Sequence, residues 1–129
     1  MDRVTGLGGF FFKCADAKRQ IDWYRKHLGI PINEEYGGWN FEWSNAEDPK
    51  EKGMTVFSLF PESTDYFGPS PQRFMFNFRV NDLDALLAAL ASEGVKIDPK
   101  REDAPYGRFA WIYDPEGNKI ELWEPPPGK

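Results

Sequence analysis

The sequence predicts an α+β fold built from a duplicated half-domain, in which two half-sheets face each other across a cleft. Residues 8–30 and 74–97 each contain an apolar strand, an acidic residue and an amphipathic helix that ends at a glycine. Residues 37–62 and 107–125 each contain an aromatic strand, a polar turn and a second apolar strand. A period of about 66 residues that covers the chain only twice is typical of a duplicated half-domain and too long for a solenoid.

The first half begins with a strand and a capped helix. Along residues 9–14, Phe10, Phe12 and Cys14 alternate with Gly9, Phe11 and Lys13, which is the two-residue period of a strand with two different faces. Asp16 is placed to cap the helix that follows, and Gly29 is placed to end it. The helix has apolar residues at three- and four-residue spacing, namely Ile21, Tyr24 and Leu28.

The second half repeats this arrangement. Asn81 or Asp82 caps a helix that Gly94 ends. Its apolar face consists of Leu83, Leu86, Leu87 and Leu90. Residues 114–117 carry Pro and Gly where a tight turn requires them, so the strands on either side are predicted to form a hairpin.

The 129 residues are expected to form one domain. The half-domains are placed at residues 5–62 and 73–125, joined by a linker at 63–72 that is rich in Pro, Ser and Gly.

The net charge of -5 argues against nucleic acid or an anionic membrane as partner. No apolar run is long enough to span a bilayer, and the N-terminal residues do not resemble a secretory signal, so we expect a cytoplasmic protein. The only cysteine, Cys14, excludes an internal disulfide and lies in an apolar strand, where a buried, inert thiol is expected rather than a nucleophile.

The order strand, helix, three strands, twice repeated, resembles the vicinal oxygen chelate superfamily. The stretch DPEGNKIELWEP near the end is the most specific match, and WYRKHLG in the first helix adds to it. The superfamily includes glyoxalase I, extradiol dioxygenases, and fosfomycin and bleomycin resistance proteins. The resemblance covers residues 5–125 and implies two βαβββ half-domains that form a curved mixed sheet around a cleft. It does not identify the activity, because one fold carries several functions.

Enzymes of this superfamily hold a divalent metal between the halves, and the resemblance allows its ligand places to be located here. The two histidine places fall at Gly9 and Met75, and the two carboxylate places fall at Ser58 and Glu121. Only Glu121 can serve as a ligand of the usual kind, whereas a stable site needs three or more converging donors. We therefore expect no metal and no other cofactor. His27 lies near the end of the first helix, where an exposed, structural role is expected.

The strand period also predicts which side chains face the cleft. If Gly9 and Met75 face inward, the same faces carry rings together with a few polar groups, which is the usual composition of a small-molecule pocket. The predicted ligand-binding residues are Phe11, Lys13, Ser58, Phe60, Met75, Asn77, Arg79, Lys119 and Trp123, with Glu121 as the candidate catalytic residue. By the same period, Phe10, Phe12, Phe76 and Phe78 are expected under the helices. An alternative is that Lys13 and Arg79 reach solvent at strand ends while Lys119 pairs with Glu121.

Large rings recur at every second position in residues 39–43 and 109–113, and core or dimer packing explains such stripes more often than ligand stacking.

Three functions remain open. The missing metal ligands favour a metal-independent binder of a small aromatic or amphipathic molecule. The alternatives are a metal-dependent lyase or dioxygenase resembling glyoxalase I, and a metal-free enzyme in which Glu121 is the base and Lys13 or Arg79 holds an anionic intermediate. Superfamily members commonly form dimers, so a homodimer is also expected.

Overall fold

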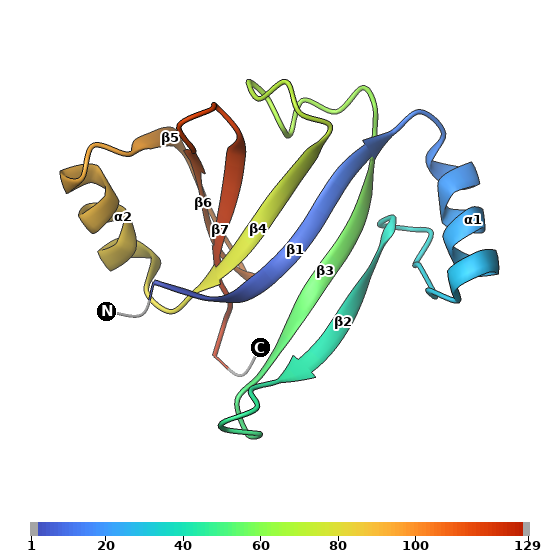
Figure 1. The fold of residues 1–129 in the computed structure, drawn as a ribbon, viewed down its shortest axis with the longest axis horizontal. Helices are drawn as coiled ribbons and strands as arrows, with labels where there is room; N and C mark the ends of the chain where they lie inside the picture. Colours follow the sequence, from blue (N-terminus) through green and yellow to red (C-terminus); the bar gives the residue numbers. More distant parts are fainter. Residues whose placement is uncertain (1–2, 128–129) are drawn as a thin grey trace.

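The computed structural model describes residues 3–127 as one twisted and curved sheet with two helices (Figure 1). The strands are β1 (Val4–Cys14), β2 (Gly38–Ser44), β3 (Lys52–Pro61), β4 (Phe74–Val80), β5 (Lys96–Ala104), β6 (Gly107–Tyr113) and β7 (Lys119–Glu124). The helices are α1 (Ala17–Leu28) and α2 (Leu83–Ser92). The sheet has the order β2-β3-β1-β4-β7-β6-β5, so β1 and β4 form its centre. The predicted α+β class and curved mixed sheet are confirmed.

The sheet register shows the internal duplication residue by residue. Strand β3 runs parallel to β1, and Phe11 pairs with Ser58. Strand β7 runs parallel to β4 in the same way, and Asn77 pairs with Glu121. The antiparallel pair β1–β4 joins the halves. Ser58 and Glu121 therefore occupy equivalent places in the two halves, as the sequence predicted.

Both predicted helix caps form. The Asp16 side chain accepts a hydrogen bond from the backbone N–H of Arg19 at 3.1 Å, and Asp82 accepts one from Ala85 at 3.0 Å. Gly29 ends α1 in the left-handed conformation, which an L side chain rarely adopts. No helix within residues 3–127 is long and apolar enough to cross a membrane.

The first half departs from the expected order of three strands after the helix. Two strands follow α1, because the segment before β2 forms a turn and only one isolated bridge, between Asn33 and Gly38. Pro31 cannot donate a backbone hydrogen bond to a neighbouring strand. The Asn33 side chain instead accepts a hydrogen bond from the N–H of Glu35 at 2.8 Å, and Gly37 adopts a positive φ of 73°. This local turn replaces the strand that β5 provides in the second half.

Each helix covers one end of the outer sheet face and leaves the centre uncovered (Figure 1). Phe12 packs in the cluster under α1 and Phe78 in the cluster under α2, as predicted. Phe10 and Phe76 were also expected under the helices, and this is wrong: they pack against each other at 5.4 Å, and Phe76 is 38% exposed. Both residues lie on the central strands, between the areas that the helices cover.

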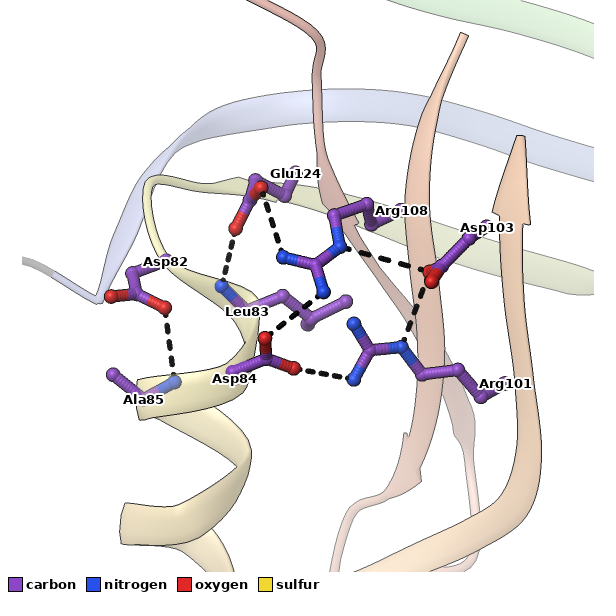
Figure 2. Close-up of polar contacts among 8 residues, drawn as sticks. All are labelled: Asp82, Leu83, Asp84, Ala85, Arg101, Asp103, Arg108 and Glu124. Atoms are coloured by element: carbon purple, nitrogen blue, oxygen red, sulfur yellow. Dashed lines mark hydrogen bonds and ion pairs between the residues drawn. The ribbon is translucent and has the colours of Figure 1, made fainter. Parts of the chain in front are cut away.

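Ion pairs fasten the start of α2 to the strands beside it (Figure 2). Asp84 on the helix accepts hydrogen bonds from Arg101 of β5 at 2.6 Å and from Arg108 of β6 at 3.0 Å. Glu124, at the end of β7, accepts the backbone N–H of Leu83 at 2.8 Å. The partners are partly exposed, so each pair contributes little alone, but together they fix α2 relative to β5, β6 and β7.

Candidate functional site

A cavity of about 400 Å³ lies between the two halves on the inner side of the sheet. Side chains from β1, β2 and β3 meet side chains from β4, β5, β6 and β7 around it. The lining consists of Phe11, Asn40, Met54, Val56, Phe60, Tyr66, Asn77, Glu102, Tyr106, Phe109, Glu121 and Trp123. Most of these groups are aromatic or aliphatic, and the polar ones are few, as in ordinary small-molecule sites.

Glu121 is the most deeply buried charged group of this cavity, with 2% of its surface exposed. Three neutral donors reach its carboxylate: the hydroxyl of Tyr66, the amide of Asn77 and, at 3.2 Å, the indole N–H of Trp111. Burial raises the pKa of Glu121, the three hydrogen bonds oppose that rise, and the charge of Glu102 adds to it. The net result is a carboxyl group that retains its proton to a higher pH than usual.

Tyr66 reaches Glu121 from the segment between β3 and β4. Lys119 holds this segment in place, because its ammonium donates to the backbone carbonyls of Tyr66 at 2.8 Å and Gly68 at 3.0 Å. Phe67, which lies between Tyr66 and Gly68 in the sequence, is fully buried. It packs in the core cluster next to the cavity. Burial and the neighbouring Glu121 raise the pKa of the Tyr66 phenol, so it remains a hydrogen-bond donor.

Two stacked ring pairs stand in the cavity lining. Phe60 and Tyr66 are 5.4 Å apart between centroids, and Phe109 and Trp123 are 6.2 Å apart. The Trp123 indole also donates to the backbone carbonyl of Tyr106 at 3.0 Å. A side chain on Gly107 would start 2.2 Å from the indole nitrogen of Trp123, so glycine is required there. These contacts fix the rings before any ligand arrives.

The structure places five of the ten predicted site residues around the cavity. Phe11, Phe60, Asn77, Glu121 and Trp123 line the cavity. Met75 is buried in the hydrophobic cluster that contains Phe11 and Trp123, and Ser58 is buried against Gly38. The predicted strand register is therefore confirmed, although neither Met75 nor Ser58 lines the cavity.

The three predicted cations lie elsewhere, which corrects the expected lining. Lys13 lies over the ring of Phe67 at 5.5 Å, and Lys119 binds the carbonyls of the β3–β4 segment instead of pairing with Glu121. Arg79 lies between the rings of Trp43 and Trp123, 5.3 Å from each, and is 8% exposed. It lines a separate cavity beside the end of β7. Lysine and arginine have long, flexible side chains, so each can lie against a ring or a backbone carbonyl outside the cleft even when its backbone position faces inward.

The superfamily's metal site does not fit the residues present. Gly9 has no side chain, and the other two equivalent places carry the thioether of Met75 and the buried hydroxyl of Ser58. The oxygens of Glu121 already accept hydrogen bonds from three side chains. Among residues 3–127 there is no group of three or more His, Cys, Asp or Glu placed to hold a metal ion. His27 is exposed on α1 against Trp23.

Several residues that line the cavity or hydrogen-bond to Glu121 were not predicted from the sequence. Tyr66 lies in the predicted linker at 63–72, and the sequence pattern of Trp111 indicates an aromatic stripe but no polar partner. Asn40 and Glu102 could have been found from strand register, since Asn40 pairs with Val56 and Glu102 pairs with Phe109, and paired residues share a face. Nothing local to the sequence places the hydroxyl of Tyr66 on Glu121.

Comparison with known proteins agrees with this geometry. A sequence model of the glyoxalase/bleomycin resistance protein/dioxygenase superfamily matches residues 7–122. The chain belongs to this superfamily. The uncharacterised protein YraH of Bacillus subtilis (strain 168) is 28% identical in an alignment of 116 residues that covers 84% of this chain and 90% of that protein.

Solved structures with this fold include two epimerases. Methylmalonyl-CoA epimerase from Mycobacterium tuberculosis is 26% identical, with a TM-score of 0.63, over 96% of this chain and 90% of that one. A variant of the Streptomyces coelicolor enzyme, in complex with 2-nitronate-propionyl-CoA, is 17% identical, with a TM-score of 0.68, over 98% of both chains. The second likeness shows the fold alone.

Proposed function

We propose that this protein binds a small aromatic or amphipathic molecule in the cavity around Glu121, without the help of a metal. The observation that carries the proposal is the composition of the cavity: fixed rings surround one buried carboxylate that neutral donors hold in place. Burial of ligand rings in such a cavity is worth about 25 cal/mol per Å² of apolar surface. The preformed walls reduce the ordering cost of binding.

A cavity-filling variant tests this proposal. Val56 lines the cavity, so Val56→Phe should occupy ligand space and weaken binding of any cavity ligand by tenfold or more. Val4 is 52% exposed and lies outside the cavity, so Val4→Phe is the matched control. A thermal-shift screen of small aromatic compounds on wild type, followed by calorimetry on both variants, gives the answer. Hits that bind Val56→Phe and Val4→Phe equally well would show that the cavity is not the site.

A second candidate is acid–base chemistry by Glu121 without a metal. A buried carboxyl group with a raised pKa in a cavity is a common feature of such sites, and Asn77 is the one donor within residues 3–127 that hydrogen-bonds its Oε2. The similarity to the epimerase from M. tuberculosis suggests methylmalonyl-CoA as the substrate for a test. If Glu121 acts as an acid or base, solvent deuterium should enter methylmalonyl-CoA in the presence of the protein. Glu121→Gln should abolish this exchange while sparing binding. We rank this second because Glu102 and Glu121 would repel the carboxylate of that substrate. A metal-dependent lyase or dioxygenase ranks third, because the donor set does not fit.

We also propose a homodimer formed through the uncovered centre of the outer sheet face. Leu7, Phe74 and Phe76 are 37–42% exposed there, and the face is centred on the β1–β4 pair that relates the halves. A face with internal two-fold character is suited to a two-fold contact with a second copy. Phe76→Gln should shift the mass measured by light scattering toward the monomer, whereas Phe41→Gln, at a site 43% exposed on β2, should leave it unchanged. Equal effects of the two variants would remove the proposal.

The buried free thiol of Cys14 is compatible with the expected cytoplasmic location.

A further inference from the structure

The charged groups that line the cavity are both acidic. Glu102 and Glu121 belong to the lining, while neither a lysine nor an arginine does. The nearby lysines are engaged outside the lining: Lys119 donates to backbone carbonyls, and its charge also interacts with Glu121 from behind the Tyr66 and Trp111 rings, while Lys100 lies over the ring of Trp111. The electrostatic potential inside the cavity is therefore expected to be negative.

Among the residues that the structure describes, the hydrogen-bond partners of the buried carboxylate are all neutral. Tyr66, Asn77 and Trp111 donate hydrogen bonds to it, and no ion pair within residues 3–127 includes Glu121. Neutral dipoles stabilise a buried charge less completely than a cation in contact would. A positively charged ligand would supply the missing compensation.

The rings of the lining would recognise the same kind of ligand. Aromatic faces attract cations by about 0.5–2 kcal/mol each, with the larger values in desolvated sites. This protein already uses its rings in this way, because Lys13 lies over Phe67 and Arg79 lies over Trp123. Within residues 3–127, the cation–ring contacts do not involve Phe11, Phe60 or Phe109, which face the cavity.

We propose that the cavity is specific for a monovalent organic cation with an apolar body, such as a substituted ammonium, whose charge is placed toward Glu121 and Glu102 and whose body packs among the rings. This rests on the proposed binding function and specifies its ligand class. A neutral ring compound would gain the packing alone, and an anion would be repelled by both carboxylates.

The test compares three probes that share a phenyl ring: benzyltrimethylammonium, its uncharged isostere neopentylbenzene, and phenylacetate. Affinities are measured by calorimetry or NMR titration on wild type and on Glu121→Gln. The glutamine should be accommodated, because Asn77 Oδ1 is buried without a partner among the described residues and rotation of the amide lets it accept from Gln. Circular dichroism and Tm check that the fold is kept. Glu116→Gln, in the exposed turn before β7, is the control for a change of net charge.

We expect benzyltrimethylammonium to bind wild type at least tenfold more tightly than neopentylbenzene, and to lose about tenfold or more in Glu121→Gln but not in Glu116→Gln. Neopentylbenzene should bind wild type and Glu121→Gln alike. Cation affinity should also increase with pH as Glu121 loses its proton, while that of the neutral probe stays flat. The ionisable groups that face Glu121 are Tyr66, Glu102 and Lys119, and Glu102→Gln separates the contribution of Glu102.

The outcomes separate the two proposals. Equal binding of the cation and its neutral isostere, unchanged in Glu121→Gln, would overturn the cation inference and leave the binding function standing. Tighter binding of phenylacetate than of the cation would also overturn the inference. If none of the three probes binds, or if those that bind are unaffected by Val56→Phe, both proposals fail.

Discussion

Removal of one hydroxyl, in Tyr66→Phe, tests how the site is held together. The phenol donates to Glu121, which is 2% exposed, while the ring stacks on Phe60 and would stay in place. Loss of a hydrogen bond to a buried charge costs about 1.5–3 kcal/mol. For a chain of 129 residues, an unfolding entropy of about 2.1 cal/mol/K per residue converts this into a Tm lower by roughly 6–11 °C. Tyr36→Phe, at a site 52% exposed, should stay within about 0.5 kcal/mol of wild type.

Calorimetry of Tyr66→Phe and Tyr36→Phe at several pH values is the assay. The cost of Tyr66→Phe should shrink at low pH, where Glu121 is protonated and the hydrogen bond no longer involves a charge. In a Glu121→Gln background the same change should cost only about 0.5–1.5 kcal/mol, the value for a neutral hydrogen bond. A cost that is the same at every pH and in both backgrounds would refute the view that Tyr66 stabilises a charged Glu121.

Three further predictions concern the same site. Elemental analysis of protein purified without chelator should find no stoichiometric zinc, nickel, manganese or iron, and about one metal per chain, removable with loss of an activity, would contradict the donor analysis. Because folding raises the pKa of Glu121, wild type should lose stability as pH rises from the unfolded pKa of a glutamate through the folded one, and Glu121→Gln should lack this decline while the control Glu116→Gln keeps it. Lys119→Met should free the segment 62–73, so hydrogen exchange there should speed up about tenfold in comparison with Lys26→Met on α1, and equal exchange in the two variants would show that Lys119 does not hold the segment.

The face of each strand was predictable from the sequence because side chains alternate with a period of two. That period, anchored at the caps Asp16 and Asp82, placed Phe11, Asn77 and Glu121 on the inner side. The internal duplication also predicted which positions of the two halves are equivalent, although no contact between residues was known. These inferences depend only on local pattern, which a single sequence displays.

The remaining features depend on tertiary structure. Tyr66 lies in a segment without periodicity, and its path is fixed by Lys119 and Phe67, which act from other elements. Arg79 has a long side chain that could reach solvent, the cleft or a ring, and the sequence contains no signal that selects the rings. The missing third strand of the first half depends on a local turn at Asn33, whose competition with a strand pattern was not recognised.

The central claim is that the cavity around Glu121 is the small-molecule site, and indole N–H signals test it most directly. A two-dimensional ¹H–¹⁵N NMR titration with benzyltrimethylammonium follows Trp111, whose indole donates to Glu121, and Trp123, which lines the cavity. Trp23 is 50% exposed on α1 and serves as an internal control. We predict saturable shifts of the Trp111 and Trp123 signals and an unmoved Trp23 signal. Saturable shifts confined to Trp23, or none at Trp111 and Trp123 at saturating probe, would contradict the claim.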